Sequence, residues 1–493
     1  MALSLRPDGG ARPVQNESGN MLATSELIVK SLKTEMVDQV KLAAPICLGF
    51  LCNRFVSTCS TVVVGRQGTV ELAAVQLAVS LANVTGYSLM VGVASTLQTT
   101  AGQAFGARNF SEVSVCLQRC VLLCSLVLCL ISALWLNAEV LLRFAGQDKA
   151  VSTLAARYLT LLLPGVCCYM VTQCLQNWLA AQRVTGPAGT GGIINAVVYL
   201  PLCWSLVHPL GFGFIGAAIA TSLSNVFLML WMIFNTWWVL RGRLASSWQG
   251  LSKEALKDWC PFVRLALPNL LMISEWWASE ITVLLAGTLP NAALSLDALA
   301  VMATTTSICF MAPLSFGIAA NTRVSNELGA GRELAAAQAS RGSCWLGVII
   351  CCTTSILLLM LRRPWASLFT ANPKVIEHSL PILTLCGVYV LADGMAGVIA
   401  GSLKGCGRHA VLAPVIIASY YVVGLPCSWF FAWQLHWGTF GLAVGSTVGT
   451  YVHFSSFFVL LSKTSWATMA QHTQARLGRL LQKPADASVE DAQ

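Results

Sequence analysis

Three acidic residues lie inside long apolar stretches of the chain, namely Glu275, Glu280 and Asp393. A charged acid at the centre of a membrane helix costs about 2.5–3.5 kcal/mol. Such an acid must therefore face water, pair with another group or take up a proton. Because burial favours the neutral form of a carboxyl, an acid in this position can bind and release protons near physiological pH. The acids indicate proton-linked chemistry within a membrane.

The three acids differ in their surroundings. Glu275 lies near the middle of its apolar stretch and is the first candidate for binding a proton or a substrate. Asp393 is also central and is followed by glycines at positions 394, 397, 401 and 405, which permit close helix approach. Glu280 is five residues from Glu275, about 140° around a helix, so the two side chains face different ways. Glu280 could instead be a snorkelling or interhelical acid.

The first half of the chain has no candidate acid within its apolar stretches and carries neutral or basic polar residues there. These are Asn53, Arg54, Asn83, Gln98 and Asn195. Arg54 could bind an anionic group of a substrate or pair with an acid from the second half. Trp276 and Trp277 directly follow Glu275, and an aromatic ring beside a carboxylate suits a hydrophobic cation. Packing against lipid or core is the favoured interpretation for at least one of these two rings. Arg54, Asn83, Gln98, Trp276 and Trp277 are possible cavity-lining residues.

The composition excludes a water-soluble domain of 493 residues, because 56% of the residues are hydrophobic and 10% are charged. Soluble domains carry about 25% charged residues. Apolar runs of the length that a bilayer requires, about 20 residues, predict an all-α membrane protein with twelve transmembrane helices. The predicted spans are 42–64, 72–101, 114–136, 152–181, 189–208, 212–240, 261–288, 297–322, 341–361, 376–403, 411–433 and 438–462.

The distribution of basic residues predicts the orientation. Most Lys and Arg residues fall on the side of the two chain ends, which predicts that both termini are cytoplasmic. This bias accounts for the net charge of +9 without a nucleic-acid partner. The predicted parts are an N-terminal segment (1–41), a six-helix lobe (42–240), a linker (241–260), a second six-helix lobe (261–462) and a basic tail (463–493). Residues 21–40 and 464–483 could be amphipathic helices on the headgroups or solvated segments.

Signatures of other chemistry do not emerge from the sequence. The 19 cysteines lie mostly in apolar runs, without the spacing of metal ligands or of a disulfide framework. The six histidines are scattered, and no phosphate-binding loop is found. We therefore expect no metal, no cofactor and no enzymatic activity.

Short similarities between the halves indicate an internal repeat. Gly329 lies 223 positions after Gly106 in a similar Gly-Ala segment, and Gly441 lies 225 positions after Gly216 in another. A Gly-rich turn near residue 186 corresponds to one near residue 405. Matches in the same order and at nearly one offset predict two parallel bundles related by an axis along the membrane normal. Transporters with such repeats place the substrate site at the bundle interface and work by alternating access.

Several segments resemble the eukaryotic branch of the multidrug and toxin extrusion (MATE) transporters. They are Leu267–Pro268 with Glu275–Glu280, Thr322–Gly331, Asp393–Gly394, Lys404–Gly407, Asn83–Gly86 and Gly102–Ala107. The resemblance covers about residues 38–462 and implies a two-lobed bundle that exports organic solutes in exchange for protons. It implies that Glu275 and Asp393 form the proton-linked site, with Glu280 as a supporting acid. The chain departs from the family pattern at Gln98, where relatives carry an acid, and at Arg54, where they carry an uncharged residue.

These observations predict a proton-coupled antiporter that exports small amphipathic solutes such as drugs, toxins or secondary metabolites from the cytoplasm. The expected partners are a small-molecule substrate, protons and the lipid bilayer. We expect a monomer in the plasma membrane or in a vacuolar or other organellar membrane. The alternatives are a sodium-coupled exporter of the same fold and a non-transporting receptor or scaffold with twelve spans.

Overall fold

The computed structural model describes residues 17–64, 69–257, 259–370 and 372–490, and within these ranges all regular elements are helical. Residues 1–16 of the predicted N-terminal segment and 491–493 of the predicted tail lie outside them. The N-terminal lobe contains α1 (Glu17–Val64), α2 (Thr69–Ala82), η1 (Asn83–Tyr87), α3 (Ser88–Gly106), α4 (Phe110–Leu136), α5 (Ala138–Phe144), α6 (Lys149–Ala181), α7 (Gly186–Val207) and α8 (Phe214–Leu240).

The C-terminal lobe follows a linker with two short 3₁₀ turns, η2 (Ala245–Ser247) and η3 (Lys253–Leu256). Its helices are α9 (Trp259–Leu271), α10 (Ser274–Ala286), α11 (Ala292–Gly329), α12 (Glu333–Ser367), α13 (Pro373–Gly405), α14 (His409–Ile417), η4 (Ala418–Gly424), α15 (Leu425–Trp429), η5 (Phe430–Gln434) and α16 (Gly438–Ser462). The final helix is α17 (Trp466–Glu490).

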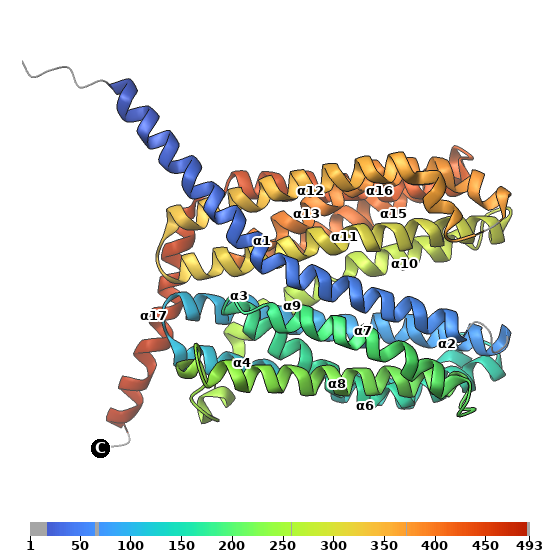
Figure 1. Cartoon of the computed structure of the whole chain (residues 1–493), viewed down its shortest axis with the longest axis horizontal. Helices are drawn as coiled ribbons and strands as arrows, with labels where there is room; N and C mark the ends of the chain where they lie inside the picture. The colour runs from blue at the N-terminus through green and yellow to red at the C-terminus, as the bar shows by residue number, and fades with distance from the viewer. Residues whose placement is uncertain (1–16, 65–68, 258, 371, 491–493) are drawn as a thin grey trace, which may run out of the picture.

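The two lobes are bundles of roughly parallel helices that lie one above the other in Figure 1, which confirms the predicted architecture. Helix α1 belongs to both lobes, because its early part contacts α11 and α12 and its later part runs along α7. The largest buried side chains of the N-terminal lobe include Trp135, Trp178 and Tyr158. Within each lobe, a Trp indole donates to a Thr hydroxyl: Trp135 to Thr85 at 2.9 Å and Trp365 to Thr305 at 2.8 Å.

Eleven helices in the described part of the chain are long and apolar enough to cross a membrane. The predicted seventh span, 261–288, is wrong as a single helix, because it is divided into α9 and α10, of 13 residues each. Pro268 lies inside α9, where it removes a helix hydrogen bond. After it, the backbone turns more tightly, with Ile273 N donating to Leu270 O at 3.1 Å and Trp276 N to Ile273 O at 2.9 Å. The two short helices together supply the twelfth crossing.

Other helices differ from the predicted spans mainly by being longer. Helix α1 begins at Glu17, so the predicted amphipathic segment 21–40 is continuous with the first span. Helix α11 continues to Gly329, seven residues beyond the predicted end. The predicted amphipathic segment 464–483 lies within α17, which crosses the end of the bundle from which α1 emerges (Figure 1). Leu477 of α17 packs into the N-terminal core, and Met469 packs against the end of α11.

The internal repeat is visible where α3 and α11 meet. A Cβ atom on Gly106 would collide with the backbone of Asn326, and one on Gly329 would collide with the backbone of Gln103. Gly106 and Gly329 lie 223 positions apart, as do Gln103 and Asn326, so the two contacts are symmetric. Gln98 and Asn321 share this spacing, and Asn321 Nδ2 donates to Gln98 Oε1 at 3.1 Å. The axis that relates the lobes therefore passes between α3 and α11.

Candidate functional site

The break between α9 and α10 positions Glu275. The residue lies in the first turn of α10, where the helix dipole stabilises a negative charge. Its side chain is 18% exposed. The break is held by Tyr421, whose hydroxyl donates to the Ser274 carbonyl at 2.9 Å. A discontinuous membrane helix is a common way of building an ion or substrate site at mid-depth.

Tyr420 is the nearest partner of Glu275. Its hydroxyl donates to Glu275 Oε1 at 2.7 Å, and its oxygen lies 3.2 Å from His453 Nδ1 and 3.4 Å from Thr450 Oγ1. His453 Nδ1 is itself 3.9 Å from Glu275 Oε1. Tyr420 lies in the π-helical turn η4, and such turns are frequent at functional sites because they redirect a side chain. The site thus joins α10, η4 and α16.

Asp393 belongs to the same cluster and lies in α13. It is buried, at 7% exposure. Its carboxyl interacts electrostatically with Glu275 and, one turn earlier, with Tyr389. Gly394 allows α13 to pack tightly here, because a Cβ atom at this position would collide with Cys351 Sγ and Pro313. The structure therefore brings Glu275 and Asp393 together, although 118 positions separate them.

This arrangement suits proton binding. Two carboxyl groups that interact in a poorly hydrated site repel each other when both are charged, and the binding of a proton or a cation removes this repulsion. The Tyr420 hydroxyl links the carboxyl of Glu275 to the imidazole of His453, which is a second titratable group. His453 Nε2 is buried and has no hydrogen-bond partner within the described residues. Proton exchange and the binding of a cation are the chemistry that this cluster can perform.

The other predicted site residues lie in different environments. Glu280 is exposed and makes no hydrogen bond or ion pair with the described residues. Trp276 is 44% exposed, whereas the indole nitrogen of Trp277 is buried without a partner in the described part of the chain. Asn83 is exposed at the start of η1.

Gln98 and Arg54 lie in the N-terminal lobe or at its boundary. Gln98 Nε2 donates to Ile318 O and to Thr322 Oγ1, both at 2.9 Å, so its amide joins α3 to α11. Arg54 Nε is buried without a hydrogen-bond partner, and its guanidinium forms no ion pair among the described residues.

Tyr420, His453 and Tyr389 were missed by the sequence analysis. His453 is one of six scattered histidines, and Tyr420 is 145 positions from Glu275. The only available signal was position along the spans, since Tyr389 lies one helical turn from Asp393. Helical periodicity indicates which residues share a face, but it does not show which helices lie beside one another.

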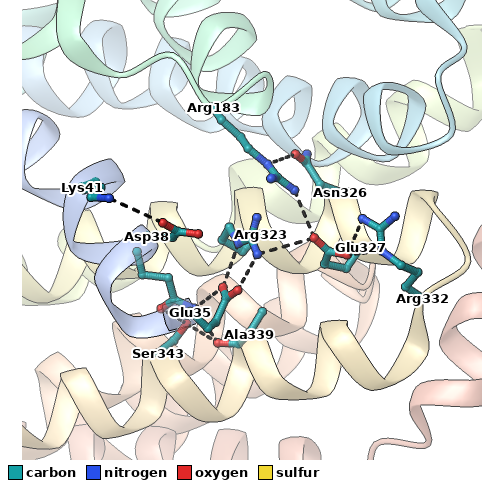
Figure 2. Close-up of polar contacts among 11 residues, drawn as sticks. Glu35, Asp38, Lys41, Arg183, Arg323, Asn326, Glu327, Arg332, Ala339 and Ser343 are labelled. Carbon is teal, nitrogen blue, oxygen red and sulfur yellow. Dashed lines mark hydrogen bonds and ion pairs between the residues drawn. The ribbon is translucent and has the colours of Figure 1, made fainter. Parts of the chain in front are cut away.

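A network of ion pairs joins the two lobes (Figure 2) near the end of α11 against which α17 packs. Arg323 of α11 binds Glu35 of α1 in a bidentate ion pair, with Arg323 Nε donating to Glu35 Oε1 at 2.8 Å. Arg183, between α6 and α7, donates to Glu327 Oε1 at 3.1 Å and to Asn326 Oδ1 at 2.9 Å. Arg332 donates to Glu327 Oε2 at 2.6 Å. We call Glu35, Arg183, Arg323, Glu327 and Arg332 the end network.

Three buried cysteines also meet within the N-terminal lobe. Cys120 Sγ lies 3.7 Å from Cys174 Sγ, which lies 3.9 Å from Cys124 Sγ. Sequence spacing did not reveal this cluster, because Cys174 comes from α6 and the other two from α4. A separate cavity of about 540 Å³ on the outer face of α13 and α16, lined by Val388, Tyr451 and Ser455 among others, contains none of the predicted site residues.

Two helical lobes related by an axis along the bundle, with interacting acids in a broken-helix site, define a secondary membrane transporter. The sequence model of the MatE family matches residues 45–205 and again residues 270–430. The chain belongs to the MATE family of multidrug and toxin extrusion transporters.

Individual relatives agree with this assignment. Protein DETOXIFICATION 16 of Arabidopsis thaliana is 32% identical over 452 residues, which cover 91% of this chain and 92% of the relative. Multidrug and toxin extrusion protein 1 of Danio rerio is 31% identical, over 94% of this chain and 78% of the relative. The crystal structure of the eukaryotic MATE transporter AtDTX14 superposes with a TM-score of 0.85 at 29% identity, covering 90% of this chain and 99% of that one.

Proposed function

We propose that this protein is a proton-coupled antiporter that exports small amphipathic organic solutes from the cytoplasm. The observation that carries the proposal is the cluster of Glu275, Tyr420, His453 and Asp393 inside the C-terminal lobe. It combines two interacting acids with a phenol and an imidazole, and the acids are the groups through which proton binding can oppose the binding of a cationic solute. Trp276 and Trp277 directly follow Glu275 in the sequence, and aromatic surface from one of them would suit a hydrophobic cation.

In the proposed cycle, Glu275 and Asp393 bind the solute when the cluster is accessible from the cytoplasm. After the lobes reorient, the two acids take up protons from the outer side, and the loss of negative charge weakens the hold on the solute. The protonated transporter then returns and releases its protons to the cytoplasm. Because the solute and the protons compete for the same groups, the export of solute is coupled to the inward movement of protons.

We also propose that the end of the bundle carrying α17 faces the cytoplasm, as the distribution of basic residues indicates. The end network then closes the cytoplasmic side, and it must open before a cytoplasmic solute can enter between the lobes. The predicted lobes, 42–240 and 261–462, are the bodies that would move. The proposed membrane is the plasma membrane or that of a vacuole or other organelle, and the proposed unit is a monomer.

The free energy released by inward proton movement is sufficient to drive this export. One proton moving down about 100 mV and one pH unit yields about 2.3 and 1.4 kcal/mol, or about 3.7 kcal/mol in total. At about 1.4 kcal/mol per factor of ten, this supports a gradient of roughly 500-fold for a neutral solute.

The test is efflux from proteoliposomes that contain the purified protein and a fluorescent organic cation. We expect an imposed pH step to drive transport at constant sodium, and an imposed sodium gradient at constant pH to have no effect. Transport driven by sodium alone would contradict proton coupling and favour the sodium-coupled exporter. The absence of solute movement under both gradients would favour a receptor or scaffold.

A further inference from the structure

A cavity of about 240 Å³ opens at the junction of the lobes, beside the end network. Phe105 at the end of α3, Arg108 in the following turn and Phe110 at the start of α4 line one part of it, and Arg183 lines it from the turn between α6 and α7. Asn326 and Arg332 form the opposite wall, from the C-terminal lobe. The cavity therefore has walls from both lobes, and three arginines surround it.

The arginines around this cavity outnumber the acids that neutralise them. Arg183, Arg323 and Arg332 all pair with Glu327, at 3.1, 3.6 and 2.6 Å, and Arg323 also pairs with Glu35. Arg108 forms no ion pair or hydrogen bond through its side chain among the described residues. Three guanidinium groups thus share two carboxylates and Arg108 pairs with neither, so these six side chains together carry two positive charges in excess. Burial, and after it the neighbouring charge of Arg323, lower the pKa of Arg183 from its usual value.

The backbone holds two of these arginines in a costly conformation. Arg108 and Arg183 have φ angles of 59° and 63°, in the left-handed region that L residues other than Asn, Asp and Gly seldom adopt. Both turns are fixed by main-chain hydrogen bonds, from Asn109 N to Ala104 O and from Val184 N to Leu179 O, each at 2.9 Å. Glycine would relieve the strain at either position. Arginine at both strained turns of one cavity indicates that the side chains have a role there.

We propose that this cavity binds a phosphate monoester dianion from the side of the membrane that carries α17. The two negative charges of the ligand match the two positive charges in excess, and Arg presents paired donors that suit phosphate oxygens. Asn326 holds the wall in place and not the ligand, because its Nδ2 donates to Gly102 O and Ala181 O and its Oδ1 accepts from Arg183 Nε. The Phe105 and Phe110 rings, whose centroids are 6.2 Å apart, supply apolar surface for the group that carries the phosphate. The ligand is a soluble phosphomonoester, inorganic phosphate or a lipid headgroup that ends in a monoester.

Binding here favours one conformation of the transporter. Because the walls come from both lobes, a bound dianion bridges Arg183 of one lobe and Arg332 of the other. It stabilises the arrangement in which the lobes meet at this end, and it must leave before they separate. The consequence, slower transport in the presence of the ligand, rests on the proposed transport function. The binding itself does not depend on which ion drives transport.

The test measures binding, so that its outcome is independent of transport. Thermal unfolding of the purified full-length protein is followed at constant ionic strength with inorganic phosphate or with chloride. We expect phosphate to raise the melting temperature. The Arg108→Asn variant keeps a residue that tolerates the left-handed turn and loses one guanidinium. It should bind phosphate at least about tenfold more weakly, as the loss of a charge-assisted hydrogen bond implies.

Arg241→Gln is the matched control, because Arg241 also lies after a helix at this end but stacks on Trp237 outside the cavity. This variant should bind phosphate as the unmodified protein does. Vesicles of phosphatidylcholine containing one tenth phosphatidic acid test the lipid source against vesicles containing the same fraction of phosphatidylserine. Stabilisation by phosphatidic acid that depends on Arg108 identifies a lipid ligand. The proposal is overturned if neither phosphate nor phosphatidic acid stabilises the protein, or if Arg108→Asn responds as fully as Arg241→Gln.

Discussion

The two lobes have similar helices and different interiors. In the N-terminal lobe, α7 and α8 are joined by a neutral pair, with Ser224 Oγ donating to Asn195 Oδ1 at 2.8 Å. About 225 positions later, the corresponding contact between η4 and α16 joins Tyr420 to Thr450 and His453 and extends to Glu275. The repeat thus preserves a polar contact at equivalent places, and only the C-terminal copy is titratable.

The difference extends to the acids themselves. The positions 225 residues before Glu275 and Asp393 are Phe50 and Cys168, which are neutral. The helix carrying Phe50 is continuous, whereas the one carrying Glu275 is broken two residues earlier. The N-terminal lobe therefore has no acid at the positions that correspond to Glu275 and Asp393, whereas the C-terminal lobe combines these two acids with a broken helix. The comparison teaches that a repeat can keep its packing while its chemistry is concentrated in one copy.

The largest expected effect comes from Glu275→Gln. The substitution keeps the shape of the side chain and removes its ability to bind a proton or a cation. We expect uptake driven by a pH step in proteoliposomes to fall to the level of vesicles without protein. Ser224→Ala is the matched change in the other lobe and should retain nearly full uptake. Equal losses in the two variants would show that both lobes contribute to coupling.

The second expected effect is a loss of stability when an ion pair is removed from one end of the bundle, compared with the other end. Glu327 is only 5% exposed and is shared by three arginines, so Glu327→Gln leaves Arg183 and Arg332 without a carboxylate, while Arg323 keeps its pair with Glu35. Removing one partner of a fully buried ion pair typically costs about 3–5 kcal/mol, and the cost here is smaller because Arg183 and Arg332 are 35% and 60% exposed and therefore partly screened by solvent. We expect a clearly lower melting temperature in detergent.

The control for this change lies at the opposite end. Glu377 pairs with Arg363 at 2.7 Å, but both side chains are more than half exposed. Exposed pairs contribute about 0–1 kcal/mol, so Glu377→Gln should change the melting temperature little. A similar decrease in both variants would mean that the end network has no special role in holding the lobes together.

A smaller effect is expected from Tyr420→Phe, which removes the hydroxyl that donates to Glu275. A hydrogen bond to a charged group contributes about 1.5–3 kcal/mol, so uptake should fall at least about tenfold. Tyr421→Phe is the adjacent control, because its hydroxyl bonds only to the neutral Ser274 carbonyl. Its loss should be smaller. If the two variants were equally impaired, Tyr420 would be holding the helix break and not the proton site.

Much of the fold could be predicted from the sequence, because the length of an apolar run and the bias of basic residues report directly on membrane crossing. The repeat was also visible, since Gly106 and Gly329 are required by backbone contact at the axis. The break after Leu271 was not predicted. Pro268 weakens the helix, but whether the helix bends or breaks depends on partners such as Tyr421, which are distant in sequence.

Only those candidate site residues whose type is unusual in an apolar run could be predicted from the sequence. An acid in an apolar run is conspicuous, so the sequence alone makes Glu275 and Asp393 candidates. Their neutral partner Tyr420 has no such mark, because a tyrosine in a membrane helix is ordinary. The end network was missed because Arg183 and Glu327 each lie near a helix end, where charges are expected, and 144 positions separate them. Only the packing of the lobes brings them together.

The most direct test is the number of protons released when substrate binds. The purified protein in weakly buffered detergent solution is mixed with an organic cation, and a pH-sensitive dye reports the protons set free. We predict that the unmodified protein releases protons on binding and that the Glu275→Gln, Asp393→Asn double variant releases none. Undiminished release from the double variant, with substrate still bound, would contradict the assignment of these carboxyl groups as the site where protons and substrate exchange.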